Sequence, residues 1–227
     1  KQLAAFKTLT ILWLDGTQVT DVGVKELAKL KHLTDLGLTN TKITDESLKE
    51  LASLKHLTAL EISGTKVSGA GLKELKSLTR LYLDRTKATD AGLKEVAKLE
   101  NLTTLSLEGN RVTDTGLKEL TNLKHLTTLF LSSTEVTDEG LKELACLTNI
   151  ISLSLDSTKV TDAGLKELQK LTSLGELYLN RTLVTDVGMK ELAKLKNLSI
   201  LGVSGTKVTD AGVQELEKAL PKLTVSK

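Results

Sequence analysis

Aromatic side chains recur at one position of a regular pattern. Four of the five aromatic residues, Trp13, Tyr82, Phe130 and Tyr178, each lie between two leucines. In an alternating L-x-L segment the middle side chain points away from the buried leucines. These rings therefore line one surface, where they favour recognition of a binding partner. The alternative is that strands favour aromatic residues and that the rings only cover the sheet.

Charged residues flank the aromatic positions on the same surface. Seven acids oppose three arginines there, a balance of −4, whereas the whole chain carries +2, so the remaining surface carries +6. The acids are Asp15, Asp35, Glu61, Asp84, Glu108, Asp156 and Glu176, and the arginines are Arg80, Arg85 and Arg181. This balance predicts a basic or mixed partner. The residues predicted to bind it are Trp13, Asp15, Glu61, Tyr82, Asp84, Arg85, Phe130, Asp156, Tyr178 and Arg181.

Two segments repeat an aromatic and an arginine at the same spacing. LYLDRT places Tyr82 near Arg85, and LYLNRT places Tyr178 near Arg181. A ring and a guanidinium together can stack against a partner or clasp a carboxylate. Duplication of a longer block of sequence explains the pairs equally well, because this pairing chemistry is generic.

The residue types that usually carry catalysis are not grouped. His32, His56 and His125 share a position that asparagine occupies in other units, with no cysteine or carboxylate fixed beside them as a zinc site requires. Cys146 falls at a surface position without a histidine near it to act as a base, and a single cysteine forms no internal disulfide. The sequence contains no glycine-rich phosphate loop. We therefore expect no catalytic residue, no metal and no cofactor.

The elements that position these residues belong to a repeating unit. A residue followed by x-V-T-D, or a close variant, marks nine units with a spacing of 24 and one gap of 21. The marker residues are Thr17, Thr41, Thr65, Thr86, Asn110, Thr134, Thr158, Thr182 and Thr206. Self-similarity at a period of about 20 to 29 residues indicates a solenoid.

Each unit predicts a strand followed by a helix. Leu33, Leu36 and Leu38 form the alternating L-x-x-L-x-L of a short strand. Thr44 and Asp45 then offer side-chain oxygens to the first amides of a helix, which in the first unit is predicted over residues 23–30. Successive strands must pair in parallel, about 4.8 Å apart. The wider helices lie outside, which curves the array.

These residues resemble the leucine-rich-repeat family over essentially the whole chain. The x-V-T-D-x-G-L-x-x-L segment is similar to its helix-bearing subclasses, above all the threonine-rich arrays of planctomycete-type bacteria and, less closely, the cysteine-containing repeats. The resemblance implies an α/β fold: a right-handed horseshoe solenoid with a parallel β-sheet on the concave face and α-helices on the convex face. At the marker position, a threonine hydroxyl can donate to and accept from the turn backbone.

One elongated domain is expected over residues 1–227. Residues 1–8 correspond to the end of a truncated repeat, residues 9–219 to nine repeats, and residues 220–227 to a C-terminal cap strand. In the third repeat Ser68 and Gly69 replace Thr-Asp and three residues are deleted from the helix-to-strand return, which predicts a tighter turn there. The chain begins at Lys1 without methionine, which indicates a fragment of a longer protein.

Membrane and nucleic-acid partners are not expected. No segment approaches the roughly 18 apolar residues of a membrane span, and we expect a cytoplasmic monomer. A cationic stripe directly after the marker could meet phosphates, but no aromatic residues are interleaved with it, and nearby aspartates such as Asp45 and Asp114 offset its charge. The stripe consists of Lys42, Lys66, Lys87, Arg111, Lys159 and Lys207.

Three hypotheses for function remain at this stage. The leading one is a non-catalytic protein-interaction module that binds a protein or peptide on the concave sheet. The second is a structural or regulatory segment of a larger receptor- or kinase-linked protein, and an engineered repeat scaffold also stays open. An enzyme ranks last, because the repeats supply regularly separated residues rather than a convergent acid, base and nucleophile.

Overall fold

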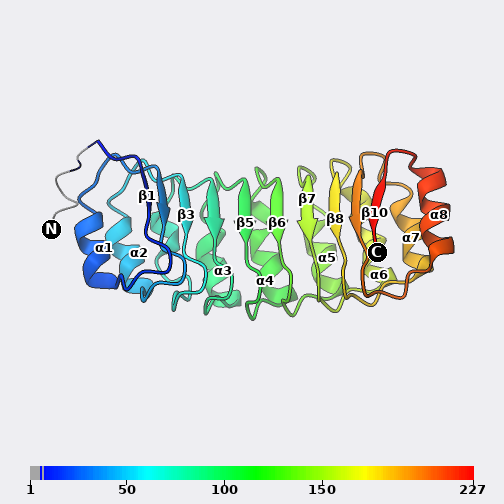
Figure 1. Cartoon of the computed structure of the whole chain (residues 1–227), viewed down its shortest axis with the longest axis horizontal. Helices are drawn as coiled ribbons and strands as arrows, with labels where there is room; N and C mark the ends of the chain where they lie inside the picture. The colour runs from blue at the N-terminus through cyan, green and yellow to red at the C-terminus, as the bar shows by residue number, and fades with distance from the viewer. Residues whose placement is uncertain (1–5, 7) are drawn as a thin grey trace.

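Ten short strands form one parallel sheet in which each strand pairs with the next along the chain. The structure is a computed structural model that describes residues 6 and 8–227. Figure 1 shows the strands side by side in one layer, with the helices in a second layer behind them. The strands are β1 (Ile11–Trp13), β2 (Asp35–Gly37), β3 (Ala59–Glu61), β4 (Arg80–Tyr82), β5 (Thr104–Ser106), β6 (Thr128–Phe130), β7 (Ser152–Ser154), β8 (Glu176–Tyr178), β9 (Ile200–Gly202) and β10 (Thr224–Ser226).

A helical segment follows every strand from β1 to β9, as the repeat predicts. The α-helices are α1 (Asp21–Leu27), α2 (Asp45–Leu51), α3 (Asp90–Val96), α4 (Asp114–Glu119), α5 (Asp138–Leu144), α6 (Asp162–Leu165), α7 (Asp186–Leu192) and α8 (Asp210–Ala219). The 3-10 segments are η2 (Leu72–Glu74), η3 (Leu120–Asn122) and η4 (Glu167–Lys170). The helix predicted over residues 23–30 begins earlier, at Asp21, and ends at Leu27. The predicted partial repeat over residues 1–8 falls mostly outside the described residues.

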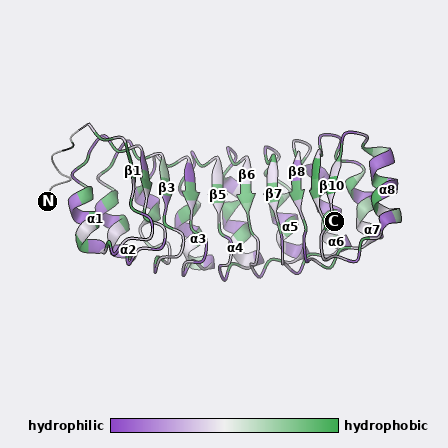
Figure 2. Cartoon of the chain, in the orientation of Figure 1, coloured by the Kyte–Doolittle hydropathy of each residue, from purple (hydrophilic) through white to green (hydrophobic). Residues whose placement is uncertain are grey.

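Leucine columns form one continuous core between the two layers. Leu36, Leu60 and Leu81 pair in register on neighbouring strands and are fully buried. The helix stripe predicted in the first repeat is also confirmed, because Val24, Leu27 and their neighbours Ala28 and Leu30 are buried. Figure 2 shows hydrophobic and hydrophilic residues mixed along every element, as expected for an array whose repeats each bury one side.

The marker threonines close the turn after each strand. The Thr41 hydroxyl donates to the carbonyl of Leu38 at 2.6 Å, and Thr65, Thr134, Thr158 and Thr182 make the same bond three residues back. The predicted donation to the turn backbone is therefore confirmed. Asn110 has a different role: its amide donates to the carbonyls of Leu107 and of Leu83 in the preceding repeat, so it ties two repeats together.

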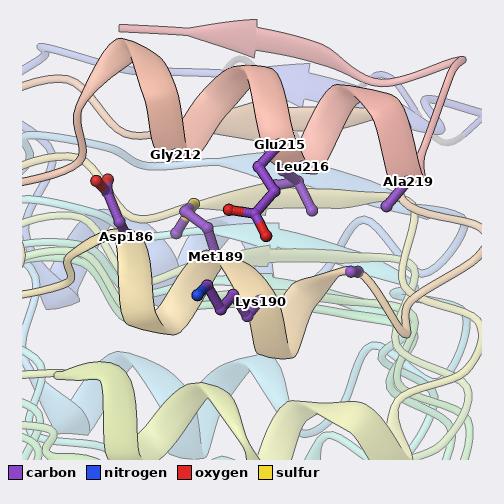
Figure 3. A pocket seen from close by; sticks show the side chains of 8 residues that line it. Asp186, Met189, Lys190, Gly212, Glu215, Leu216 and Ala219 are labelled. Atoms are coloured by element: carbon purple, nitrogen blue, oxygen red, sulfur yellow. The ribbon is translucent and has the colours of Figure 1, made fainter.

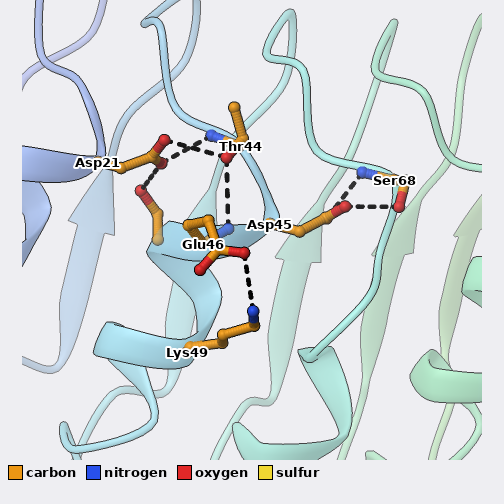
Figure 4. A network of polar contacts seen from close by, with 7 residues as sticks. Asp21, Thr44, Asp45, Glu46, Lys49 and Ser68 are labelled. Atoms are coloured by element: carbon orange, nitrogen blue, oxygen red, sulfur yellow. Dashed lines mark hydrogen bonds and ion pairs between the residues drawn. The ribbon is translucent and has the colours of Figure 1, made fainter.

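A second set of hydrogen bonds joins each helix to the next repeat. Asp114 at the start of α4 accepts from the backbone amide of Thr137 at 2.8 Å and from its hydroxyl at 2.7 Å. Figure 4 shows the same arrangement for Asp21 with Thr44 and for Asp45 with Ser68. We call this column of bonds the Asp–Thr ladder. The expectation that the aspartate caps its own helix is wrong, because threonine supplies the cap, as Thr44 does toward Glu46 N at 3.3 Å, and the aspartate binds the following repeat.

The Asp–Thr ladder explains the glycine two residues after each aspartate. A Cβ built on Gly140 would lie 2.4 Å from Asp114 Oδ1 and 2.9 Å from Leu117 Cδ1. Ser47 occupies the same position in α2, and its hydroxyl donates to Asp21 Oδ1 at 2.5 Å. The position therefore accepts either no side chain or one that hydrogen-bonds to the aspartate.

The third repeat interrupts both the helix layer and the Asp–Thr ladder. Its helix is replaced by the single 3-10 turn η2, so the deletion shortens the helix itself, whereas the prediction placed it only in the helix-to-strand return. Gly69 stands where other repeats have the aspartate of the ladder, so Thr89 in the next repeat has no carboxylate to bind there. The Thr89 side chain also makes no cap bond to its own helix. A Cβ on Gly92 would lie 2.2 Å from the carbonyl oxygen of Ser68, so the backbones of neighbouring repeats come close together at this point.

Candidate functional site on the concave sheet

The exposed face of the sheet carries alternating rings and serines. The strand pairing places Tyr82, Ser106, Phe130, Ser154 and Tyr178 directly beside one another on β4 to β8. Neighbouring rings are therefore separated by two strand spacings, about 10 Å. Ser106 and Ser154 are only 1% and 6% exposed, which is consistent with large side chains on either side of them.

The four predicted aromatic anchors differ in exposure. Trp13 is 50% exposed, as predicted. Tyr82, Phe130 and Tyr178 are half-buried, so these three rings are less exposed than predicted. Trp13 also covers its neighbour: a Cβ on Gly37 would lie 2.1 Å from its ring. The rings thus cover part of the sheet and also leave part of their surface open to solvent.

A shallow hollow of about 410 Å³ lies between Phe130 and Tyr178. We call it the β6–β8 hollow, because β7 forms its floor and the two rings stand on β6 and β8. The remaining lining comes from three carboxylates and three serines, and includes no basic residue. Its lining residues are Glu108, Phe130, Ser132, Ser152, Ser154, Asp156, Glu176 and Tyr178.

Hydrogen bonds hold the carboxylates of the β6–β8 hollow in place. Asp156 accepts from the backbone amide of Asn180 at 2.7 Å and from its side-chain amide at 3.0 Å. Glu176 accepts from the Ser152 hydroxyl at 2.9 Å. Burial and the neighbouring carboxylates of Asp84 and Asp156 raise the pKa of Glu108, and a hydrogen bond from Ser132 opposes the rise. Negative charge is therefore concentrated in the hollow.

The acids toward the N-terminal half of the sheet are neutralised or already engaged. Arg80 forms an ion pair with Asp35 at 2.6 Å. Asp84 accepts from Glu108 N at 2.9 Å and also from the hydroxyls of Ser106 and Ser63. Burial and the charge of Asp15 raise the pKa of Glu61, which Arg80 partly offsets. The predicted residues of this half are therefore spread over several strands and do not converge on one hollow.

Arg85 and Arg181 occupy strained turn positions. Their φ angles are 51° and 56°, in the left-handed region where glycine or asparagine is usual. A Cβ on Gly109 would lie 3.0 Å from Arg85 Cγ, and one on Gly205 would lie 3.2 Å from Arg181 Cγ. Each arginine stem therefore lies over a glycine of the next repeat, which gives the repeated Tyr and Arg segments a structural role that the sequence did not indicate.

The β6–β8 hollow contains residues that the predicted site left out. The predicted binding residues in this hollow are Phe130, Asp156 and Tyr178. The prediction left out the three serines, Ser132, Ser152 and Ser154. It counted Glu108 and Glu176 among the acids of the concave surface but did not predict that they bind a partner. The serines are small and uncharged, so no composition signal distinguishes them. Writing the repeats in register would have placed them between the two rings.

The histidines and the cysteine stay apart from any candidate site. His32, His56, His125 and Cys146 are all exposed. Among the residues that the structure describes, no group of three or more His, Cys, Asp or Glu side chains could hold a metal ion. Asparagines at the histidine position bridge repeats instead, since the amides of Asn101, Asn149 and Asn197 each donate to a carbonyl of the preceding repeat.

The cationic stripe is exposed along one edge of the array. Within residues 6 and 8–227 none of its six members forms an ion pair. The capping aspartates expected to offset its charge instead bind the next repeat, as Asp45 does with Ser68 and Asp114 with Thr137. Any offset of the stripe's charge by these aspartates therefore acts without ion pairs among the described residues.

A second hollow, of about 230 Å³, lies between α7 and α8. Figure 3 shows Met189 and Leu216 at its base and Asp186, Lys190 and Glu215 at its rim. Its lining is mainly apolar, and no charged groups converge on a point within it. The β6–β8 hollow combines rings with fixed carboxylates and is the stronger candidate for a binding site.

No helix within the described part of the chain is long and apolar enough to cross a membrane.

Comparison with protein families matches residues 1–163 to a leucine-rich repeat region, and the chain belongs to the leucine-rich-repeat family. Such domains are typically protein-interaction modules, whose curved arrays present extended concave surfaces, and they are usually non-catalytic. The comparison of the sequence with curated proteins gives no significant match.

Several solved structures share the fold. An internalin C2 of Listeria monocytogenes is 31% identical with a TM-score of 0.75, and the match covers 91% of this chain and 84% of that protein. A leucine-rich-repeat protein of Leptospira interrogans is 26% identical with a TM-score of 0.76, covering 100% and 62%. A plant peptide hormone receptor, solved in complex with RGF2, is 19% identical with a TM-score of 0.63, covering 100% and 40%, and shows the fold alone. The chain thus spans less than two thirds of the Leptospira protein and of the receptor.

Proposed function

We propose that this chain is a non-catalytic interaction module that binds a protein or peptide on its concave sheet. The observation that carries the proposal is the row of three half-exposed rings on β4, β6 and β8, together with the carboxylates between them. Aromatic anchors in partly desolvated settings dominate the energetics of protein interfaces. The predicted binding residues on this face remain Trp13, Asp15, Glu61, Tyr82, Asp84, Arg85, Phe130, Asp156, Tyr178 and Arg181.

The distribution of polar contacts supports the concave face over the convex one. On the helix side, the aspartates are engaged in the Asp–Thr ladder. Five of the eight ion pairs in the described chain also lie there, each between residues three apart in or at the end of one helical segment. On the concave side, the acids of the β6–β8 hollow form no ion pair within the described residues, and the charge of Arg85 acts only on Glu108. A surface whose charges are not compensated internally is better suited to an external partner.

We assign the repeats to the helix-bearing bacterial type with a period of 24 residues, on the basis of threonine at eight of nine marker positions. We also expect the chain to be a monomer. The alternative is a structural or regulatory segment of a larger receptor- or kinase-linked protein. The full reading frame around this chain separates the two functions.

Affinity capture with matched variants tests the proposal. The concave variant carries Trp13→Ala, Tyr82→Ala, Phe130→Ala and Tyr178→Ala, and the convex control carries Lys25→Ala, Lys94→Ala, Lys118→Ala and Lys166→Ala, all at exposed helix positions. Circular dichroism checks that both variants fold. We expect a partner that the parent and the convex control retain and the concave variant loses. Retention by all three proteins, or capture of no partner, contradicts the proposal.

A further inference from the structure

We propose that the β6–β8 hollow binds a basic side chain, an arginine or a lysine, that projects from a protein or peptide partner. The inference rests on the proposed function and deepens it, because it names the chemistry of the residue that the sheet recognises. It is carried by a specific juxtaposition: two rings face each other across β7, and three carboxylates surround the space between them.

The spacing of the rings fits a single cation. Phe130 and Tyr178 both lie beside Ser154, so they are two strand spacings apart, about 10 Å. A cation midway between them lies within about 6 Å of both rings, the range of cation–π attraction. The serine between the rings is short, which leaves the space open above β7.

The carboxylates supply the complementary charge. Glu108, Asp156 and Glu176 give the lining a formal charge of −3, and none of the three forms an ion pair with a described residue. Asn180 and Ser152 orient two of them and leave other lone pairs free to accept. A guanidinium presents a planar fork of donors to such carboxylates while its face stacks on an aromatic ring.

A neighbouring gap with the same backbone provides an internal comparison. Tyr82 and Phe130 are also two strands apart, with Ser106 between them. Its edges differ, because Arg80 stands beside Tyr82 on β4 and Asp84 already accepts from three donors. Arg80 takes the place on β4 that Glu176 has on β8, and its guanidinium is already paired with Asp35. This gap therefore lacks that carboxylate, and the aromatic spacing alone does not make a site.

The test uses a defined probe on the full chain of 227 residues. The peptide Ac-Gly-Gly-Arg-Gly-Gly-NH2 is titrated while backbone amide shifts are recorded by NMR, and the same peptide with citrulline in place of arginine is the neutral control. We expect shifts centred on β7 and β8 with a millimolar dissociation constant, and affinity for the citrulline peptide weaker by about fivefold or more. Higher salt should weaken binding of the arginine peptide.

Matched variants locate the site. Tyr178→Ala and Glu176→Gln should each weaken binding of the arginine peptide by about fivefold, and Tyr178→Phe should retain it. Glu217→Gln, at an exposed position of α8 outside the concave face, should leave binding within about twofold of the parent. Tyr178→Phe keeps the ring and its packing, so a general loss of folding cannot imitate this pattern.

Three results overturn the inference: equal binding of the arginine and citrulline peptides, equal loss in Glu176→Gln and Glu217→Gln, and shifts away from β7 and β8 or no shifts at all. Its failure is distinguishable from that of the proposed function. If the concave variant loses a captured partner while the arginine peptide does not bind the hollow, the concave site stands and the basic side chain is wrong. If the peptide binds the hollow and no partner depends on the concave rings, the interaction module is wrong.

Discussion

The Asp–Thr ladder and the β6–β8 hollow both contain carboxylates next to hydroxyl groups. The carboxylates of the ladder are bound by the next repeat, whereas those of the hollow line a surface open to solvent. In the ladder, Asp114 receives two hydrogen bonds from Thr137 of the next repeat, and the helix geometry leaves no room for a side chain at Gly140. In the hollow, Glu108, Asp156 and Glu176 line one space that has no basic residue in its lining. Regularity alone therefore does not separate structural from binding acids; what each carboxylate contacts does.

Removing one aspartate of the Asp–Thr ladder should have the largest effect. Asp114→Ala leaves the Thr137 amide without its acceptor, and we expect it to lower the free energy of unfolding by about 2 to 3 kcal/mol. Asp210→Ala is the matched control, because no threonine among the described residues donates to its carboxylate, which contacts Lys227 at the surface; we expect it to cost less than about 1 kcal/mol. Urea denaturation measures both. Equal losses in the two variants would show that the aspartate acts only on its own helix.

Replacing the glycine next to the Asp–Thr ladder by alanine should change the free energy of unfolding by a smaller amount. The change should be a loss of stability, whereas this substitution in a helix usually gives a gain. Glycine to alanine within a helix normally stabilises by up to about 1 kcal/mol. Gly140→Ala should instead destabilise by about 1 to 2 kcal/mol, because the added Cβ meets Asp114 Oδ1.

Gly140→Ser separates steric exclusion from loss of flexibility. Its hydroxyl can donate to Asp114 as Ser47 donates to Asp21, so Gly140→Ser should be more stable than Gly140→Ala. Thermal unfolding of the two variants side by side gives the order. A stabilising Gly140→Ala would contradict the close packing of the Asp–Thr ladder.

The two kinds of acid should respond to pH in opposite directions, which is the smallest effect and the most specific. Hydrogen bonds from the backbone and hydroxyl of Thr209 lower the pKa of Asp186. Its contribution to stability is therefore present above the unfolded pKa of about 3.9 and is lost as the pH falls through the folded pKa. Burial and neighbouring acids raise the pKa of Glu108, so its ionisation costs stability as the pH rises above about 4.3.

Denaturation across pH checks these signs. The stability of the parent relative to Asp186→Asn should shrink as the pH falls below about 4. The stability of Glu108→Gln relative to the parent should grow as the pH rises from about 4 to 7. If both variants change with pH in the same direction, the contrast between the Asp–Thr ladder and the hollow is wrong.

Much of the fold follows from local patterns. Alternating leucines predicted the strands, the 24-residue spacing predicted parallel pairing in register, and the threonine hydroxyl was correctly expected to close the turn at Thr41. The prediction of the helix start was two residues late, because Thr20 and Asp21 begin α1 before its apolar stripe is visible. The replacement of a whole helix by η2 was also missed, since the loss of three residues was assigned only to the return loop.

The candidate site was predicted less completely. The aromatic column was found because Trp13, Tyr82, Phe130 and Tyr178 are large and rare in this chain. The serines of the β6–β8 hollow have no such signature, and Arg85 and Arg181 gave no sign that their stems lie over glycines of the next repeat. These roles depend on neighbours about 24 residues away along the chain.

The sequence by itself determined the solenoid, its repeat length and the side of the sheet on which each side chain lies, because those follow from hydrophobic periodicity within one repeat. Only the tertiary structure decided what each carboxylate does. An aspartate of the Asp–Thr ladder and a carboxylate of the β6–β8 hollow both meet their neighbours through stacking of successive repeats. Contacts between repeats depend on backbone spacing and side-chain direction, which residue types alone do not specify.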